Sequence, residues 1–542
     1  MAPIDTKNSE KVKLISREII EYLTTNPQIS KDKVTNLKGR IGKKYNYNKV
    51  IKNATILGYA TSKEKLIITQ ILKRRKTRTL SGVSVIAIMT KPLPCPGTCI
   101  YCPGSDSQPG EKVAQSYTGR EPAAMRSIHN NYDPYLQVQS RINDLEVIGH
   151  EIDKIELIIM GGTFLSTDLN YQEGFIKGAI EGVIEQRVES LEEAKKLAET
   201  SKRRIVGITI ETRPDYCKEK EVDRMLNFGT TRVELGIQTV YNDIYNLVRR
   251  GHTSADSIEA IRIAKDAGLK INAHMMPNLP SASLKSDLEM FDSLFSNADY
   301  RPDMLKIYPT VVLKGTELYE WWKQGKHLPY SNEELIDLLA NVKKNIPSYV
   351  RIQRIMRDIP AYLIEAGCKK SNLRQLVQER LREIDDTCKC IRCREYGISK
   401  RKEIIDERSF DEVNLYRLDY EASNGQEIFL SYENNQENYL VGYLRLRKPS
   451  EFAHRPELND GKTMIIREIK VVGELVPKDM KPNRFSQIQH RGFGKLLMEN
   501  AEAISSEEFE AKKLAVISGI GVRDWFYEMG YKLDGVYVSK VL

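Results

Sequence analysis

Three cysteines, Cys95, Cys99 and Cys102, carry the most specific chemical signal in the sequence. They are four and three residues apart in a stretch rich in proline and glycine, and such a loop can turn three thiolates toward one iron–sulfur cubane. A cubane held by three thiolates keeps one iron without a protein ligand, and this open iron can bind and activate a small molecule. The competing interpretations are a zinc site and three unrelated thiols. No further His or Cys lies close by in the sequence to complete a zinc site.

A second group of cysteines follows much later in the chain, at Cys368, Cys388, Cys390 and Cys393. Two close spacings with one thiolate from upstream can complete a tetrahedral zinc site, which we expect to be structural. A second redox cluster is the alternative use of these four residues. The remaining cysteine, Cys217, is expected to be an uncharged buried thiol. Grouped cysteines are typical of metal sites in a reducing compartment, so we expect a cytoplasmic protein.

The region from 81 to 360 alternates short apolar runs with segments long enough for helices. This alternation predicts parallel strands with crossover helices, in an α/β arrangement of six units that favours an incomplete (β/α)6 barrel over an open doubly wound sheet. In such barrels the reactive groups lie on loops after the strands. The expected strands are Val83–Met89, Ile155–Met160, Ile205–Ile210, Arg232–Ile237, Lys270–Met275 and Met304–Tyr308.

Polar residues follow five of these strands, and they suggest a polar pocket that faces the cysteine loop. We expect about half of them to be structural. They are Gly161, Gly162 and Thr163 after the second strand, Glu211 and Arg213 after the third, Gln238 after the fourth, His274 at the fifth, and Lys306 and Tyr308 at the sixth.

From about residue 401 the pattern becomes antiparallel, with expected strands at 413–420, 427–432, 439–446 and 464–472. The run Gln489-His490-Arg491-Gly492-Phe493-Gly494 then opens a helix, where glycines leave backbone N–H groups available for a pyrophosphate. A Gly-x-Gly at a helix start is weak evidence alone. Its place after a long strand is similar to the acetyl-coenzyme A site of the GNAT acetyltransferase fold, an α+β domain.

Charge is distributed unevenly along the 542 residues. The total is +9, yet residues 1–94 hold 20 Lys or Arg against 6 Asp or Glu, so the remainder is net negative. A basic segment of this kind favours a polyanionic partner, the alternative being a solvated basic face. Its densest part is Lys73-Arg74-Arg75-Lys76-Thr-Arg78. Apolar residues at helical spacing, such as Ile15 and Ile19, predict that the region folds. No apolar run is long enough for a membrane span, and the start shows no signal-peptide core.

These observations predict four regions: a basic helical region over 1–80, the partial barrel over 81–360, a cysteine-rich zinc linker over 361–400, and an acetyltransferase domain over 401–542.

Several longer motifs in one order resemble the catalytic subunit of Elongator in its stand-alone archaeal form, and the similarity covers nearly the whole chain. They are Met89-Thr-Lys-Pro before the cysteines, Ser116-Tyr-Thr-Gly-Arg120-Glu-Pro-Ala-Ala-Met125-Arg126, Met160-Gly-Gly-Thr-Phe164, Glu211-Thr-Arg-Pro-Asp215, Gly236-Ile-Gln-Thr239, the cysteines before Glu395, and the 489–494 run. The resemblance implies a radical S-adenosylmethionine (SAM) domain and a GNAT domain that act together on tRNA. Acetyl-coenzyme A would supply a carboxymethyl group for carbon 5 of the wobble uridine.

The resemblance also implies roles for single residues. The first three cysteines would hold a 4Fe-4S cluster whose open iron binds SAM, and the basic run at 73–78 would hold the anticodon arm. Cofactor contacts are expected from Gly161, Gly162, Thr163, Glu211, Arg213, Gln238, Gln489, His490, Arg491, Gly492, Phe493, Gly494, Trp525 and Phe526, and catalytic roles from Lys306, Tyr308 and Tyr527.

One departure from the family pattern concerns the general acid. Relatives usually have two adjacent tyrosines where this chain has Trp525-Phe526, and Phe526 has no hydroxyl with which to protonate a thiolate. Tyr527 follows, but on a helix the next residue points about 100° away. The acid role therefore stays open.

Two other functions are compatible with the sequence: a protein lysine acetyltransferase in which the barrel is only structural, and a non-catalytic RNA-binding scaffold. A homodimer is compatible with the sequence, and nothing in it requires other Elongator-like subunits.

Overall fold

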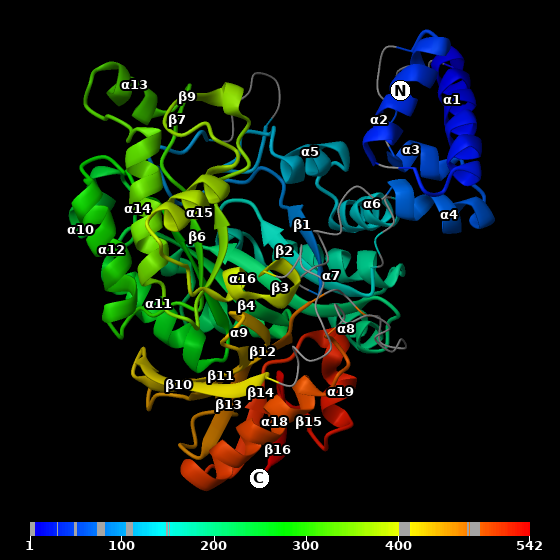
Figure 1. Cartoon of the computed structure of the whole chain (residues 1–542). Coiled ribbons are helices and arrows are strands. Elements are labelled where there is room, and N and C mark those ends of the chain that lie inside the picture. Colours follow the sequence, from blue (N-terminus) through cyan, green and yellow to red (C-terminus); the bar gives the residue numbers. More distant parts are fainter. Residues whose placement is uncertain are drawn as a thin grey trace. The chain divides into compact units, whose positions relative to one another are not determined.

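The computed structural model describes residues 6–29, 31–47, 51, 53–72, 82–104, 112–147, 150, 152–399, 412–473, 476 and 488–542. The chain divides into two compact units (Figure 1). The first contains residues 1–79 and 139–153, and the second contains residues 80–138 and 154–542.

The first unit is helical and has its own core. It contains α1 (Thr6–Thr25), α2 (Lys31–Lys44), α3 (Asn53–Gly58) and α4 (Ser62–Leu72). Ile15, Ile19 and Leu23 project from one face of α1 and pack against Leu37 and Ile56. This helical spacing confirms that the basic N-terminal region folds. The basic run at 73–78 lies outside the described residues.

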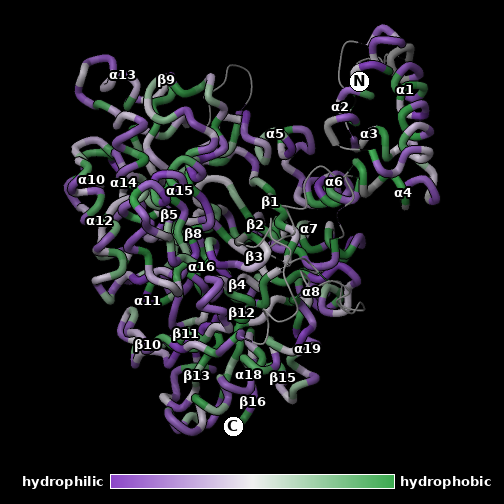
Figure 2. Tube along the Cα trace, in the orientation of Figure 1, coloured by the Kyte–Doolittle hydropathy of each residue, from purple (hydrophilic) through white to green (hydrophobic). Residues whose placement is uncertain are grey.

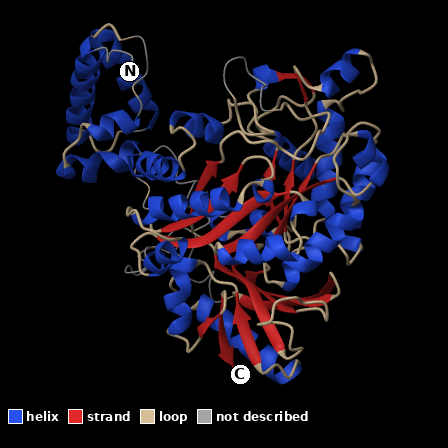
Figure 3. Ribbon diagram, turned by 180° about the vertical axis from the view of Figure 1, so that it is seen from behind, coloured by secondary structure: helices blue, strands red, loops and turns tan. Residues whose placement is uncertain are grey.

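The second unit begins with a curled sheet that, in the described part of the chain, has seven strands, all parallel to their neighbours (Figure 3). Their order along the sheet is β1 (Ser84–Met89), β2 (Lys154–Met160), β3 (Arg204–Thr212), β4 (Thr230–Gln238), β5 (Lys270–Met275), β6 (Met304–Ile307) and β8 (Arg351–Ile355). The six expected strands are confirmed. The strand β8 was missed because Arg351, Gln353 and Arg354 interrupt the apolar pattern.

Helices cover this half-barrel, and several begin at residues that cap their free N–H groups. Thr253, Ser283 and Ser331 each accept a hydrogen bond from the third residue of the following helix. The helices of the second unit are α5 (Pro122–His129), α7 (Leu169–Ile184), α8 (Leu191–Glu199), α9 (Glu219–Asn227), α10 (Asn242–Leu247), α11 (Ser254–Asp266), α12 (Leu284–Ser296), α13 (Glu317–Lys323), α14 (Asn332–Asn345) and α15 (Leu373–Glu383). The helix α6 (Pro134–Val147) belongs to the second unit up to Val138 and to the first unit from Gln139. In Figure 2 the strand β1 is hydrophobic, whereas the tip that carries α13 is largely hydrophilic. Within the described residues, no helix has the length and apolar character needed to cross a bilayer.

A second sheet follows the short helices α16 (Ile391–Arg394) and α17 (Tyr396–Ser399). Its strands, in order along the sheet, are β10 (Asn414–Ala422), β11 (Gly425–Asn434), β12 (Tyr439–Lys448), β13 (Thr463–Val471), β14 (Lys513–Val516), β16 (Tyr537–Val541) and β15 (Lys532–Asp534). The expected antiparallel strands are confirmed. The exception is the parallel pair β13 and β14, which stay paired only as far as Ile466 and Val516. Beyond that point the rest of β13 runs on without β14.

The two sheets of the second unit meet through buried charges at the N-terminal ends of the half-barrel strands, which we call the base. Asp303, just before β6, pairs with Arg467 of β13, and Asp266, at the end of α11, pairs with Arg447 of β12. Glu427 of β11 contacts both arginines. All five side chains are essentially inaccessible to water. Since breaking one buried pair leaves another charge uncompensated, removal of any one of these side chains is expected to destabilise the contact between the two sheets.

Candidate active site at the strand ends of the half-barrel

The cysteine loop follows β1 and is anchored in its middle. Ile100 is buried; its N–H donates to the Val248 carbonyl at 3.2 Å, and its carbonyl accepts from the Leu318 N–H at 2.9 Å. Cys99 and Cys102 are joined by a backbone hydrogen bond of 3.0 Å, and the two side chains stay partly exposed. The fold therefore holds the loop at the carboxyl ends of the strands, which we call the rim, with its sulfurs open to a ligand.

Hydrogen-bonding groups surround the three sulfurs. Gln115 donates to the Cys102 sulfur at 3.2 Å, and Arg250 donates to the Cys99 sulfur at 3.6 Å. The Thr163 hydroxyl lies 3.7 Å from the Cys95 sulfur. Donors of this kind stabilise the negative charge of thiolates bound to a cluster. The residues present thus fit a cubane.

Gly161 and Gly162, at the end of β2, both have positive φ, at 118° and 61°. A Cβ at Gly161 would lie 2.4 Å from the Thr90 hydroxyl, so the first glycine is required for packing against the end of β1. Among the described residues, a Cβ at Gly162 would meet only the side chain of Gln115, at 3.4 Å. Of the two, Gly162 is the position whose backbone has more room for a ligand.

A buried cluster of charges lies at the carboxyl ends of β3 to β6. Glu234 pairs with Lys306, accepts a hydrogen bond from Asn272 at 3.1 Å, and lies 2.8 Å from His274 Nε2. Lys306 also lies 3.5 Å from Glu211.

Two tyrosines border this charge cluster. Tyr117 donates to Glu211 at 2.9 Å, and Tyr308 packs edge-on against His274 with 5.4 Å between the ring centroids. The structure thus brings together the predicted Glu211, His274, Lys306 and Tyr308.

The state of Lys306 decides what this cluster can do. Burial opposes its charge, but Glu234 and Glu211 outweigh burial and raise the pKa of Lys306 above its ordinary value. Burial likewise opposes the charge of Glu234, and Lys306 and His274 together hold its pKa well below the usual range. Lys306 is therefore a permanent cation that can donate hydrogen bonds and cannot act as a base at neutral pH.

Glu211, Glu234 and His274 have ligand atoms within 4.8 Å of one another. A metal ion there would compete with Lys306, whose ammonium contacts both carboxylates. We therefore interpret the group as an ion-pair cluster.

Arg213 and Gln238 lie close to this rim. Arg213 is buried, and two of its nitrogens donate to Asp215 at 2.9 and 2.7 Å. Its third nitrogen has no hydrogen-bond partner in the described part of the chain. It faces the cysteine loop, because a Cβ at Gly97 would lie 2.5 Å from it. Gln238 has φ 74°, a strained conformation at the end of β4 that is common at ligand sites.

The predicted acetyl-coenzyme A loop begins α18 (Phe493–Ala503). Gly492 has φ 92° at the N-cap, and Gly494 packs against Val471 and Trp525, where a Cβ would lie 3.8 and 3.5 Å away. This helix start therefore lies beside the part of β13 that has left β14. Phe493 packs on Tyr432.

The side chains of Gln489 and His490 have partners inside the protein. Gln489 is buried; its oxygen accepts from Lys154 at 2.8 Å and from the Val476 N–H at 3.1 Å. His490 Nε2 lies 3.1 Å from the Val476 carbonyl. A pyrophosphate would thus meet the backbone of the loop more readily than the Gln489 side chain.

The aromatic residues at 525–527 separate into different environments on α19 (Arg523–Tyr527). Phe526 is 2% exposed and belongs to the core of the second sheet, so it cannot contact a ligand in this conformation. Trp525 lies against Gly494. Tyr527 is partly buried; burial raises its pKa, and nearby Glu199 adds to the rise.

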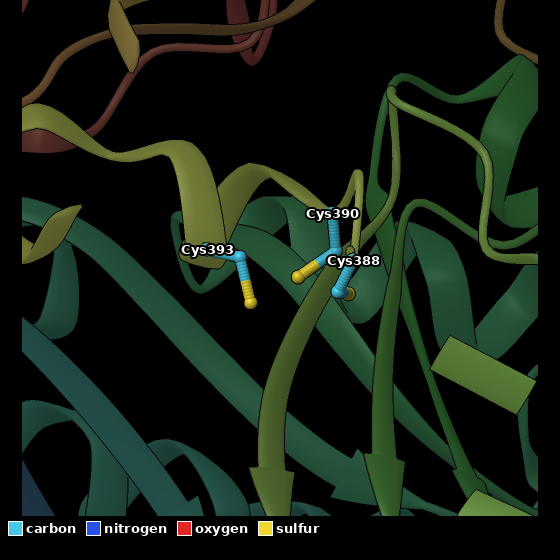
Figure 4. A group of neighbouring side chains, drawn as sticks. All are labelled: Cys388, Cys390 and Cys393. Atoms are coloured by element: carbon cyan, nitrogen blue, oxygen red, sulfur yellow. The ribbon is translucent and has the colours of Figure 1, made fainter. Parts of the chain in front are cut away.

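The second cysteine group is a separate site (Figure 4). The sulfurs of Cys388, Cys390 and Cys393 lie within 4.8 Å of one another, close enough to share one ion. Cys368 is also buried, but its sulfur is not within 4.8 Å of all three in the described part of the chain. The Cys393 sulfur also lies 3.8 Å from the ammonium of Lys343.

Sequence reasoning missed Arg250, His252 and Arg357 at the rim. Arg250 and His252 come from the run Arg249-Arg250-Gly251-His252 after β4, where two cations and a glycine were a signal that could have been used. Arg357 follows β8, the strand that was not predicted, and it donates to the Ser116 carbonyl.

Comparisons with known proteins agree with this architecture. The radical SAM superfamily profile matches residues 94–293, and the radical SAM C-terminal domain profile matches residues 302–383. The chain is 48% identical over 494 residues to a tRNA uridine(34) acetyltransferase of Methanocaldococcus jannaschii, covering 90% of each chain. It is 40% identical to human Elongator complex protein 3, covering 99% of this chain and 98% of that one. A solved structure of Methanocaldococcus infernus Elp3 with an N-terminal deletion matches with a TM-score of 0.75 and 45% identity, over 86% of this chain and 100% of that one. The chain belongs to the family of archaeal tRNA uridine(34) acetyltransferases and Elongator complex protein 3.

Proposed function

We propose that this protein is a radical SAM acetyltransferase that places a carboxymethyl group on carbon 5 of the wobble uridine of tRNA, with acetyl-coenzyme A as the carbon source. The observation that supports this most is the presence, in one compact unit, of a three-cysteine loop at a barrel rim and a glycine-rich helix start beside diverging strands. The names of the relatives support tRNA uridine 34 as the target.

Each site would contribute a different chemistry. Cys95, Cys99 and Cys102 would hold a 4Fe-4S cluster, which when bound supplies the electron that cleaves SAM to a 5′-deoxyadenosyl radical. The cation Lys306 and the open N–H of Arg213 would bind the carboxylate or hydroxyl oxygens of SAM. The backbone N–H groups at 492–494 would bind the pyrophosphate of acetyl-coenzyme A at the positive end of α18.

Several chemical steps would link these sites. Carbon 5 of uridine is a poor nucleophile toward a thioester, so simple acyl transfer would not form the required bond. A hydrogen atom transferred from the acetyl methyl group to the 5′-deoxyadenosyl radical would leave a carbon radical that adds to carbon 5 of the ring. The adduct would then lose the carbon 5 proton and one electron, which would return to the oxidised cluster. Hydrolysis of the thioester would release the carboxylate and coenzyme A. Phe526 is in the core, whereas Trp525 lies against Gly494 and would pack against the bound coenzyme, and Tyr527 is the residue to test as the acid.

The test is anaerobic incubation of reconstituted protein with acetyl-coenzyme A, SAM, a reductant and unmodified tRNA, followed by mass spectrometry of the nucleosides. We expect carboxymethyluridine from the wild type and none from C99A. Acetylation of lysine that survives C99A and ignores tRNA would support the protein acetyltransferase instead. An intact cluster without any modified uridine would refute the proposal.

We also propose that unit 1 and the basic run at 73–78 bind the anticodon arm. Lys and Arg contacts to phosphates release counterions, so replacing Lys73, Arg74, Arg75 and Lys76 with Ser should weaken tRNA binding and flatten its dependence on salt. Fluorescence anisotropy over a salt series measures both. An unchanged salt slope would show that the run at 73–78 does not contact the tRNA phosphates.

For the second cysteine group we propose a structural zinc ion on Cys388, Cys390 and Cys393. The expectation of a fourth thiolate from Cys368 can be tested directly. Zinc content should be lost in C390S. It should also be lost in C368S if Cys368 moves in to complete the site, and be retained if another ligand does so.

A further inference from the structure

Arg250 occupies an unusual position for a buried cation. It is 9% exposed and follows α10, close to the cysteine loop. One terminal nitrogen donates to the Gly236 carbonyl at 2.6 Å, and the other donates to the Cys99 sulfur at 3.6 Å. Its Nε has no hydrogen-bond partner in the part of the chain that the structure describes.

The backbone makes room for this guanidinium. A Cβ at Gly236 would lie 2.5 Å from the Arg250 nitrogen, so any larger residue there would displace the side chain. The neighbouring Arg213 is accommodated in the same way by Gly97 and Gly251, where a Cβ would lie 2.5 and 2.9 Å from its nitrogens. Glycines therefore provide the space in which both guanidinium groups lie beside the cysteine loop.

No carboxylate forms an ion pair with Arg250 among the described residues, in contrast to Arg213, which pairs with Asp215. A buried cation without an anion is costly. The anion that would balance this charge is therefore to be sought at the Cys99 sulfur.

We propose that Arg250 raises the reduction potential of the cluster held by Cys95, Cys99 and Cys102, as a positioning residue that acts through the Cys99 sulfur. The inference rests on the proposed cluster site. Reduction adds one electron, supplied by a low-potential one-electron donor, and one negative charge, with no bond formed or broken. A buried positive charge and an N–H···S hydrogen bond both stabilise the more negative state, so they favour reduction.

The test is a potentiometric titration of reconstituted protein, followed by electron paramagnetic resonance of the reduced cluster, without SAM or substrates. In R250Q the equilibrium between reduced and oxidised cluster should shift about tenfold toward oxidised, which is about 59 mV for one electron. R250K keeps the charge but cannot reach both Gly236 and Cys99, so its potential should fall by less.

Arg249 provides the matched control. It is the preceding residue, but its side chain is 49% exposed and pairs with Glu317, so R249Q removes an equal charge from a screened position and should leave the potential unchanged. Equal reduction potentials in wild type, R250Q and R250K would overturn this inference but not the proposed function. Loss of the cluster from both Arg250 variants would replace it with a purely structural role. A wild type that never assembles a cluster would overturn the proposed function as well.

Discussion

The base and the rim of the half-barrel both contain buried arginines, but they use them differently. At the base, Arg447 and Arg467 donate from all three nitrogens, to Asp266, Asp303, Glu427 and backbone carbonyls. At the rim, Arg213 and Arg250 each keep one nitrogen without a partner among the described residues. Arg445 at the base is an exception, because its Nη1 has no hydrogen-bond partner among the described residues, although it lies 3.7 Å from the Asp303 carboxylate. The contrast between the two pairs of arginines lies in the hydrogen bonds that they complete within the protein.

This difference separates structural charges from charges that can serve a ligand. An arginine whose three nitrogens all donate hydrogen bonds within the protein has no free donor for a ligand, so its removal should affect the stability of the fold. An arginine with one nitrogen left without a partner can donate to a bound ligand or cluster, so its removal should affect ligand binding or electron transfer. The three predictions below test this separation, in decreasing order of expected effect.

The largest effect is expected for Arg467→Met at the base. The change leaves Asp303 and Glu427 buried with less positive charge, which should lower the free energy of unfolding by about 3–5 kcal/mol. Urea denaturation followed by tryptophan fluorescence is suitable, because Trp321, Trp322 and Trp525 all belong to the second unit. The control is Arg380→Met, whose ion pairs with Glu333 and Asp337 are exposed and should contribute less than about 1 kcal/mol. Equal losses in the two variants would contradict the structural role of the base.

A smaller effect, and of another kind, is expected for Arg213→Met at the rim. Loss of a charge-assisted hydrogen bond costs about 1.5–3 kcal/mol, so SAM should bind about tenfold more weakly or worse to the anaerobically reconstituted protein. Calorimetric titration with SAM measures this. The comparison between base and rim would fail if R213M bound SAM normally and lost as much stability as R467M.

The smallest effect concerns His252, which is buried and packs at a tilt against Tyr245 with 4.6 Å between the ring centroids. Burial and the nearby Arg250 and Arg213 lower its pKa from 6.5 to about 2. The unfolded chain therefore takes up a proton below pH 6.5 that the folded protein does not, so stability is lost as pH falls. At pH 5 this loss amounts to about 2 kcal/mol.

The variant His252→Phe keeps the ring and removes the titration. Its free energy of unfolding between pH 7 and pH 5 should fall by about 2 kcal/mol less than that of the wild type, as measured by urea denaturation at each pH. Parallel pH profiles would show that His252 is not held neutral at the rim.

The sequence predicted the parts of this molecule whose signal is local. Apolar runs such as Ile205–Ile210 identified the strands, and the spacing of Cys95, Cys99 and Cys102 identified the loop after β1. Contacts between distant segments were not accessible, because they depend on how the sheet curls. Arg250 reaches Cys99 across 151 positions, and Arg467 reaches Asp303 across 164. The strand β8 was not predicted because its first residue, Arg351, is charged and suggested an exposed segment, whereas it is buried in an ion pair with Glu395.

The side chain of Gln489 connects the two halves of the second unit. It opens the turn before α18, accepts from Lys154 at the start of β2, and lies 3.5 Å from the Gly82 carbonyl just ahead of β1. The cysteine loop follows the carboxyl end of β1, and the 489–494 loop is held where β1 and β2 begin, so both loops depend on the same pair of strands. A transfer of the second sheet and its helices onto another barrel would therefore have to reproduce the starts of these two strands as well.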